Sequence, residues 1–427
     1  MSRTSNAATT YVLLQAGWSM LWAIAFTLSL VYQVDVAGLT PFQLVLVGTV
    51  LEATCFIGEV PTGIVADLRS RKLSVLIGLV TIGIGIIVTG AFPSFWPILL
   101  AQVIWGLGYT FVSGAAEAWV TDEVGDLNVQ PVFTRAHQWS LGMNIVGTIL
   151  AGALAIVFGS MQAPIVIGGI GFVLLAVWAR FAIQEINFVP VDREDRDSWS
   201  HIVDIGRTGL QSARQPGVVR SFLIIGLLAG LTSEIFDRLW VDRIINDFAL
   251  PNWFGDNNIS IWFTLFALVA SFIGLIASVA ANRLAKQAVH DEHPTRVMAL
   301  ISSLQVAGVL VFAVAGNVGF ALSGRWLYEA AISVAHPIRQ AWLNRNVRSS
   351  ARATTVSLMG QADALGQVAG GPTLGAVANS AGVPVALAIA GAIQLPTVAT
   401  YLKLRPNQKE RAREGQPGNE SGEQTGM

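Results

Sequence analysis

The sequence predicts an all-α membrane protein in which twelve transmembrane helices form two pseudo-symmetric six-helix bundles. Three observations predict it: an apolar composition, twelve apolar segments of spanning length, and a repeat that relates the two halves of the chain. Of the 427 residues, 53% are hydrophobic and only 12% are charged, whereas a soluble domain has about 25% charged residues. Because so little polar surface cannot coat a water-soluble globule, we expect the chain to lie in a lipid bilayer.

Twelve segments are long enough to cross that bilayer, since a transmembrane helix needs ~20 mostly apolar residues. The first segment is longer than the roughly 7–15 apolar residues of a secretory signal, so we expect it to remain as a helix. The predicted spans are residues 11–34, 42–66, 73–92, 96–121, 135–158, 162–183, 218–241, 259–283, 295–316, 319–343, 354–378 and 383–403.

The basic residues of the loops predict the orientation of these spans, because Lys and Arg accumulate in cytoplasmic loops. The loops after spans 1, 3, 5, 9 and 11 contain no Lys or Arg, and the loop after span 7 has Arg243 among several Asp residues. The loops after the even-numbered spans are all basic. We therefore expect a multi-pass protein of the cell (inner) membrane with both termini in the cytoplasm.

The polar stretches divide the chain into a short cytoplasmic N-terminus, two bundles, a central cytoplasmic loop and a polar tail that we expect to be disordered. These five parts are residues 1–10, 11–183, 184–217, 218–403 and 404–427.

Three pairs of short segments repeat in the same order in both halves. VADLRSRK (65–72) matches VAANRLAK (279–286), EAWVTDEV (117–124) matches QAWLNRNV (340–347), and RAHQWSL (135–141) matches RATTVSL (352–358). Two six-helix halves related by an axis along the membrane normal are typical of transporters.

The segment GIVADLRSRK (63–72) lies between spans 2 and 3, and it resembles the signature of the major facilitator superfamily at that place. The matching residues are Gly63, Asp67, Arg69, Arg71 and Lys72. The resemblance covers nearly the whole chain, from about residue 11 to residue 403, and it implies that family's twelve-helix fold.

Two other motifs of this family are only partly present. Span 4 has Gln102 where the family usually has Arg, and span 5 keeps the glycines of the antiporter motif but lacks its proline. EVPTGIVAD and SGAAEAWVTDE together are similar to the bacterial branch that exports macrolides or tetracyclines, with its link to antibiotic resistance.

The signature segment is expected to lie at the cytoplasmic ends of the spans. A helix N-terminus favours a negative charge, so Asp67 suits the start of span 3. The basic residues after it can pair with Asp122 and Glu123 at the end of span 4. The resemblance implies a gating role, in which this cluster holds the two halves together when the cytoplasmic side is closed, with Arg352 as a partner. The alternative is simple anchoring of basic residues at the membrane surface.

Carboxylates inside the spans are the candidates for coupling to protons. An ionisable residue at the bilayer centre costs ~2.5–3.5 kcal/mol on insertion scales and usually marks function. Glu52 and Glu59 are seven residues apart and share a helix face; Glu117 and Asp363 lie within spans 4 and 11. The alternative for each is a structural hydrogen bond, and near the inner mouth a structural or gating role is favoured for Glu59 and Glu117.

A second set of residues is expected to bind the substrate. The pairs Glu234–Arg238 and Arg325–Glu329 have i,i+4 spacing and can form ion pairs. By the repeat, Arg325 occupies the place of Gln102 in the second half. Aromatic side chains can line the cavity with these charges, which suits an amphipathic and often cationic organic molecule. The predicted substrate contacts are Trp18, Trp22, Tyr109, Glu234, Arg325 and Glu329.

The sequence thus predicts a secondary transporter that exports drug-like compounds in exchange for protons. Its partners are a small-molecule substrate, protons and the lipid bilayer, and we expect a monomer without cofactor, metal or nucleic acid. The first alternative is proton-coupled uptake of a small nutrient or ion. An intramembrane enzyme is disfavoured because no HExxH or GxSxG motif occurs, and a channel rarely has a six-plus-six repeat.

Overall fold

The computed structural model describes residues 3–190, 218–290, 294–346 and 349–404, and in these ranges the side chains of residues 281–290, 340–346, 349–355 and a few single positions lie outside the description. The described chain is helical and contains no strand. Its helices are α1 (Arg3–Phe26), α2 (Ser29–Asp35), α3 (Pro41–Leu68), α4 (Arg71–Ala91), α5 (Phe95–Val112), α6 (Ala115–Val124), α7 (Asp126–Phe158), α8 (Gln162–Ala182), α10 (Val218–Asp247), α11 (Asn258–His290), α12 (Pro294–Val314), α13 (Val318–Asn346), α14 (Ser349–Ala381) and α15 (Val383–Lys403), with a short 3-10 turn at Gly255–Asn257.

A helix occupies each of the twelve predicted spans, but two spans of the first half are interrupted. Span 1 is divided into α1 and α2 at Thr27 and Leu28, where the Thr27 hydroxyl and N–H both donate to the carbonyl of Ala23. Span 4 is divided into α5 and α6 at Gly114, whose φ of 75° is accessible mainly to glycine. The corresponding helices of the second half, α10 and α13, are continuous.

Ten of the described spans are long and apolar enough to cross a membrane by length and composition. The remaining two helices, α13 and α14, are 29 and 33 residues long. They are more polar because they carry Arg325, Glu329 and Asp363. Their length still suffices for spanning, so their polarity is better explained by a buried polar site.

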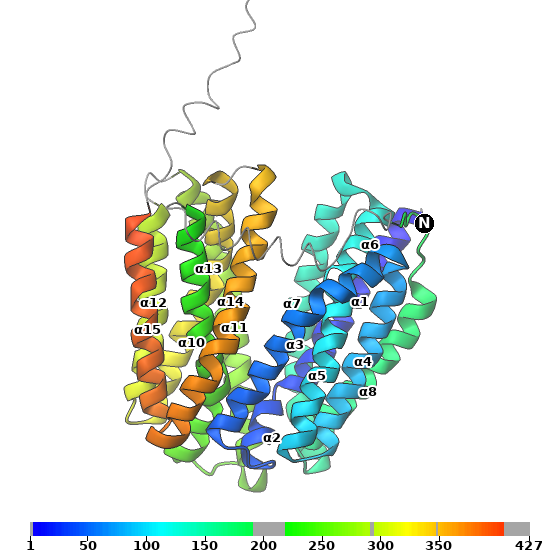
Figure 1. Ribbon diagram of the computed structural model, residues 1–427. Helices are drawn as coiled ribbons and strands as arrows, with labels where there is room; N and C mark the ends of the chain where they lie inside the picture. Colours follow the sequence, from blue (N-terminus) through cyan, green and yellow to red (C-terminus); the bar gives the residue numbers. More distant parts are fainter. Residues whose placement is uncertain (1–2, 191–217, 291–293, 347–348, 405–427) are drawn as a thin grey trace, which may run out of the picture.

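The two halves repeat the same helix packing. In the first half α1 packs on α7 and α8, α4 packs on α5 and α8, and α3 packs on α5; in the second half α10 packs on α14 and α15, α12 on α13 and α15, and α11 on α13 (Figure 1). The halves meet through α3 with α14 and α10, and through α7 with α11. This arrangement is the pseudo-symmetry that the repeated sequence segments predict.

Both the N-terminus and the end of α15 lie on one side of the molecule, the upper side in Figure 1, which we call the terminus side. The halves touch on the opposite side, where Gly371 and Gly375 of α14 approach Thr49 and Val45 of α3. Toward the terminus side, a Cβ added at Gly63 of α3 or at Gly360 of α14 would meet no described atom within 4 Å. The halves are therefore joined on the opposite side and separated on the terminus side.

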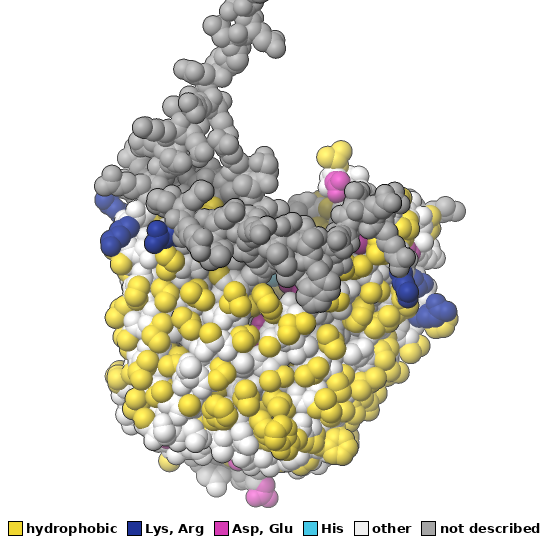
Figure 2. Space-filling view, in the orientation of Figure 1, with side chains coloured by type: hydrophobic (Ala, Val, Ile, Leu, Met, Phe, Trp, Pro, Cys, Tyr) yellow, Lys and Arg dark blue, Asp and Glu magenta, His cyan; other side chains and the backbone are white. Residues whose placement is uncertain are grey.

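The outer surface fits a lipid environment. Figure 2 shows hydrophobic side chains over the middle of the molecule, with Lys and Arg gathered near the terminus side. Large apolar side chains that would be unfavourable in water are widely exposed, including Ile57 at 68% and Phe181 at 80%.

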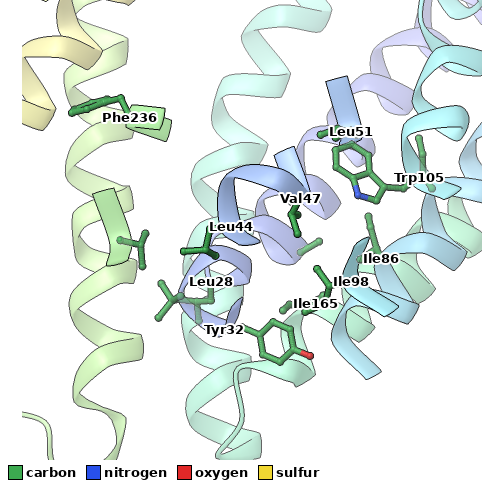
Figure 3. Packing of buried hydrophobic residues seen from close by; sticks show 14 of the residues in the cluster. Leu28, Tyr32, Leu44, Val47, Leu51, Ile86, Ile98, Trp105, Ile165 and Phe236 are labelled. Atoms are coloured by element: carbon green, nitrogen blue, oxygen red, sulfur yellow. The ribbon is translucent and has the colours of Figure 1, made fainter. Parts of the chain in front are cut away.

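The interior is packed around aromatic and aliphatic side chains. Figure 3 shows part of this core, in which Tyr32 of α2, Leu44 of α3, Trp105 of α5 and Ile165 of α8 come from the first half, and Phe236 comes from α10. The Tyr32 hydroxyl donates to the carbonyl of Thr89 at 2.9 Å, so its polar end is satisfied inside the bundle.

Arg243, which stands out as the basic residue of an otherwise acidic loop, belongs to α10 and has a structural role. Only 4% of it is exposed. Its guanidinium donates to the carbonyls of Phe312, Ala313 and Ala315 at 3.0–3.1 Å and to Asp247 at 2.8 Å. Arg243 therefore caps the C-terminus of α12, whose last carbonyls have no partner within the helix.

Candidate functional site

Two ion pairs predicted from i,i+4 spacing are present, and the first lies where the halves meet. Arg238 Nε donates to Glu234 Oε1 at 2.8 Å on α10. This pair rests against Gly48 of α3, where an added Cβ would overlap the Glu234 carboxylate and the Arg238 guanidinium. The bare backbone of Gly48 thus makes room for a charged pair from the other half.

The second pair contains an arginine shared by two carboxylates. Arg325 Nη1 of α13 lies 3.0 Å from Glu329 Oε2 and 3.8 Å from Asp237 Oδ1 of α10. Among the described residues, this buried nitrogen has no hydrogen bond of acceptable geometry. The guanidinium also lies 5.3 Å from the ring centres of Phe236 and Trp240, a distance typical of cation–π contacts. Arg325 and Glu329 are predicted site residues, whereas no role is predicted from the sequence for Asp237.

Glu52 connects the first half to this charged cluster. It is half-buried on α3, one turn after Gly48, and interacts electrostatically with Glu234, Arg238 and Asp363 of the second half. Asp363 accepts a hydrogen bond from Gln367 at 2.8 Å and interacts electrostatically with Arg339. The structure therefore brings Glu52 and Asp363 to one cluster at the junction of the halves.

The other two predicted coupling carboxylates lie elsewhere. Glu59 of α3 and Glu117 of α6 are exposed. Both lie nearer the terminus side of their spans than Glu52 does, and both interact electrostatically with Tyr109. Glu59 and Glu117 therefore lie toward the opening on the terminus side and not in the charged cluster around Glu52.

The predicted aromatic residues form one continuous group in the first half. Trp18 and Trp22 are stacked with ring centres 5.9 Å apart, and Tyr109 lies 6.4 and 6.5 Å from them. Phe26 and Trp105 continue the group toward the opposite side.

A cavity of about 260 Å³ lies between the halves, and we call it the inter-bundle cavity. Its aromatic walls come from both halves, and its charged residues are Arg325 and Glu329. Asn144 and Thr148 of α7 add polar groups. Of the predicted substrate contacts, Trp22, Arg325 and Glu329 line this cavity, whereas Trp18, Tyr109 and Glu234 are not among its described lining residues.

A larger cavity of about 350 Å³ lies inside the second half, and we call it the axial cavity. It is enclosed by α10, α12, α13, α14 and α15, and it contains Asp237, Asp363 and Arg339. This cavity was not predicted from the sequence. The glutamines within spans 9, 11 and 12 could have indicated a polar site in the second half. They are Gln305, Gln367 and Gln394, and all three line the cavity.

The signature segment forms its contacts within the first half. Arg71 Nη1 lies 3.2 Å from Asp122 Oδ2, as the sequence predicts. The first turn of α4 is capped by Ser70 and Glu185: Leu73 N donates to Ser70 Oγ at 2.9 Å, and Lys72 N donates to Glu185 Oε1 at 3.0 Å. The helix N-terminus expected for Asp67 is thus occupied by another carboxylate.

Glu123 also binds the start of the central loop, and no described basic side chain forms an ion pair with it. It accepts hydrogen bonds from the N–H groups of Ile186 and Asn187 at 2.7 and 2.9 Å. Arg69 is exposed. The side chain of Arg352 lies outside the described residues. Since Gly63 faces open space here, the predicted contact between the halves at this segment remains a prediction for the opposite conformation.

Replacing Glu185 with alanine is expected to loosen the attachment of residues 183–187 to the first half. Glu185 also accepts a hydrogen bond from Ser70 Oγ at 2.5 Å, and hydrogen bonds to a charged group contribute ~1.5–3 kcal/mol each. Hydrogen exchange of residues 183–190 should therefore become faster in Glu185→Ala. Gln130→Ala, at an exposed position of α7, is the control. Equal exchange in both variants would contradict the capping role.

Comparison with known proteins agrees with this architecture. The family model described as Major Facilitator Superfamily matches residues 7–237 and 239–424. An uncharacterized MFS-type transporter, YxaM of Bacillus subtilis (strain 168), is 22% identical over 363 residues, which are 84% of this chain and 86% of that protein.

Two crystal structures illustrate the shared fold. The nucleoside transporter NupG matches with a TM-score of 0.72 and 14% identity, covering 93% of this chain and 98% of that chain. A bacterial homolog of the human lysosomal transporter Spinster, in an inward-facing and unoccupied conformation, matches with a TM-score of 0.68 and 12% identity, covering 94% and 95%.

At these low sequence identities, the similarity of this chain to the two solved structures shows a shared fold alone. The family model matches nearly the whole chain and therefore shows the family. The twelve-helix packing, the repeat between the halves and the family match lead to one conclusion: the chain belongs to the Major Facilitator Superfamily and is a multi-pass membrane transporter.

Proposed function

We propose that this transporter exports amphipathic, often cationic, organic compounds in exchange for protons by alternating access. The inter-bundle cavity is the observation that supports this proposal most directly. Its aromatic walls, among them Trp22, Phe263 and Trp326, surround the Arg325–Glu329 pair. Aromatic faces attract cations and apolar ring systems, and the Glu329 carboxylate can pair with a positive charge. The chemistry of the cavity thus matches drug-like cations.

The proposal places the terminus side in the cytoplasm of the inner membrane. The arrangement of Lys and Arg near that side follows the positive-inside rule (Figure 2). Since the halves separate on the terminus side and touch on the opposite side, this conformation would admit substrate from the cytoplasm. Export then requires the halves to part on the opposite side.

Glu52 is proposed to take part in the coupling of proton and substrate. It stands on α3 at the junction of the halves and interacts with charged groups of the other half. A carboxylate at such a junction meets different surroundings in the two conformations, so its affinity for a proton differs between them. Glu59, Glu117 and Asp363 are proposed to assist proton transfer at the mouth and in the second half.

Glu52→Gln is expected to abolish substrate-driven proton movement. The glutamine keeps the shape of the side chain but cannot take up or release a proton. The measurement is the pH change inside proteoliposomes when ethidium, an aromatic cation, is added. Asp256→Asn, an exposed loop carboxylate, is the control for reconstitution. Proton movement equal to wild type in a folded Glu52→Gln protein would refute the assignment.

Proton-coupled uptake of a small polar nutrient is the second candidate. The hydrogen-bonding groups of the axial cavity favour it, because Gln305, Gln367 and Gln394 could bind hydroxyl or amide groups. The direction of the coupled flux separates the two candidates. With the interior acidic, an antiporter accumulates ethidium in the vesicle as protons leave, whereas a symporter moves substrate and protons in the same direction.

A further inference from the structure

The axial cavity carries charged and polar groups and reaches deep into the second half. Asp237 lies on α10 among five packed helices, yet 52% of its side-chain surface is accessible to water. Hydroxyl and amide groups line part of a wall that is otherwise apolar, and a space of this size with several polar partners has room for ordered water. The groups are Ser233, Ser302, Gln305, Gln367, Gln394, Thr397, Tyr328 and Tyr401.

The axial cavity extends from Asp237 toward the terminus side. Ile225, Ala229, Ser233 and Asp237 follow one another at intervals of four residues and therefore line one face of α10. At the other end the wall includes Tyr401, which belongs to the last turn of α15. The cavity thus runs from Asp237 toward the side on which the halves are separated.

Arg325 stands between the axial cavity and the inter-bundle cavity. Asp237 lines only the former, whereas Arg325 and Glu329 line only the latter. Arg325 Nη1 is within 3.8 Å of Asp237 and 3.0 Å of Glu329, without a well-formed hydrogen bond to either. One guanidinium is thus shared by two carboxylates that face two different cavities.

We infer that the axial cavity is a proton path separate from the substrate path, that Asp237 carries the proton, and that Arg325 links its release to substrate binding at Glu329. This inference rests on the proposed function, because it supplies the exchange of a cationic substrate for a proton.

The exchange balances in charge. Before substrate binds, Asp237 holds a proton on one carboxyl oxygen and Arg325 pairs with Glu329. A cationic substrate entering the inter-bundle cavity pairs with Glu329, and Arg325 turns to Asp237. The O–H bond of Asp237 then breaks, and its proton passes to water in the axial cavity and leaves on the terminus side. One positive charge enters the site as one leaves it.

Other charged groups around Asp237 are consistent with this exchange. Glu234 and Arg238 of α10 neutralise each other at 2.8 Å. The helices α12 and α15 contribute only uncharged groups and the Tyr401 hydroxyl to the cavity. Among the described residues, the titratable or charged groups that interact with Asp237, or that share its cavity, are Glu234 and Arg238 of α10, Arg325, Tyr328, Glu329 and Arg339 of α13, Asp363 of α14, and Tyr401 of α15.

The first test compares proton movement with substrate exchange in proteoliposomes, with ethidium as the probe. In Asp237→Asn we expect ethidium-driven proton movement to be lost, while exchange of ethidium for ethidium at equal pH continues, because exchange needs no net proton transfer. Asp237→Glu should restore proton movement. Equal loss of both activities would show a structural role and overturn the inference, as would proton movement that survives Asp237→Asn.

The second variant leaves every charge in place. Ala229 lies two turns from Asp237 toward the terminus side, so Ala229→Leu would obstruct the axial cavity. We expect slower proton movement with an unchanged KM for ethidium exchange. A raised KM with normal coupling would instead identify the axial cavity as a substrate site. If wild-type protein moves ethidium without protons, the proposed function itself fails, and the inference fails with it.

Access of water can be tested independently of transport. In a Cys55→Ala background, Gln305→Cys places a thiol in the axial cavity, whereas Ala313→Cys places one on the same helix at a buried position. A small charged methanethiosulfonate reagent should modify the first thiol and spare the second. Failure to modify Gln305→Cys would overturn the proton path.

Discussion

Gly48→Leu is expected to abolish transport while leaving both halves folded. An added Cβ at this position already overlaps the Glu234–Arg238 pair, and the longer side chain would force α3 away from α10. Overpacking costs ~1–3 kcal/mol, and a change of about 3 kcal/mol shifts the ratio of two conformations about 150-fold. The conformation that is joined on the opposite side would become rare, and the alternation between conformations would stop.

The accessibility of a cysteine on the opposite side measures this shift. Phe42 of α3 lies near Gly375 of α14 where the halves touch, so Phe42→Cys in the Cys55→Ala background should react faster with a maleimide once Gly48 is leucine. The control is Gly142→Leu, since Gly142 of α7 has no described atom within 4 Å of an added Cβ. With Gly142→Leu in place, the cysteine of Phe42→Cys should react with the maleimide no faster than it does without that substitution. No acceleration in Gly48→Leu would contradict the proposed contact.

Arg243→Ala is expected to lower the stability of the second half by ~1–3 kcal/mol for each buried carbonyl that loses its donor. The lost ion pair adds little, because the Asp247 side chain is 41% exposed. The change leaves Asp247 without its cation and the carbonyls of Phe312, Ala313 and Ala315 without their donor. Arg243→Lys should recover only part of the loss, because one ammonium group cannot reproduce the planar set of donors.

Thermal denaturation in detergent checks this prediction. Arg220→Ala is a matched control on the same helix, because Arg220 is exposed and surface substitutions usually change stability by less than ~0.5 kcal/mol. A melting temperature for Arg243→Ala equal to that of Arg220→Ala would show that the cap of α12 contributes little.

The helices and the equivalence of the two halves could be predicted from the sequence because the signals are local or repeated. Apolar length predicts each span, and repeated segments such as those at residues 65–72 and 279–286 predict the equivalence of the halves. The interruptions at Thr27 and Gly114 were not predicted. Glycine is frequent in membrane helices, and only the surrounding packing decides which glycine adopts a positive φ.

The candidate site was predicted in part. Glu234–Arg238 and Arg325–Glu329 follow from i,i+4 spacing, but the approach of Asp237 to Arg325 joins two helices that are distant in sequence. The cap that Glu185 provides for α4 likewise joins residues more than a hundred positions apart. Contacts of this kind depend on the packing of the bundle, which one sequence does not reveal.

The interrupted helices give the two halves different mechanical properties. In the first half, α1 and α2 meet at Thr27, which lines the inter-bundle cavity, and α5 and α6 meet at Gly114. Their counterparts α10 and α13 continue without an interruption of the helix, although Pro337 removes one hydrogen bond within α13. Bending is least costly where the helical ladder of hydrogen bonds is already broken, so the first half is the compliant partner. A bulky substrate in the inter-bundle cavity would therefore be accommodated by bending of the first-half helices, while the distances between the charged side chains of the second half stay the same.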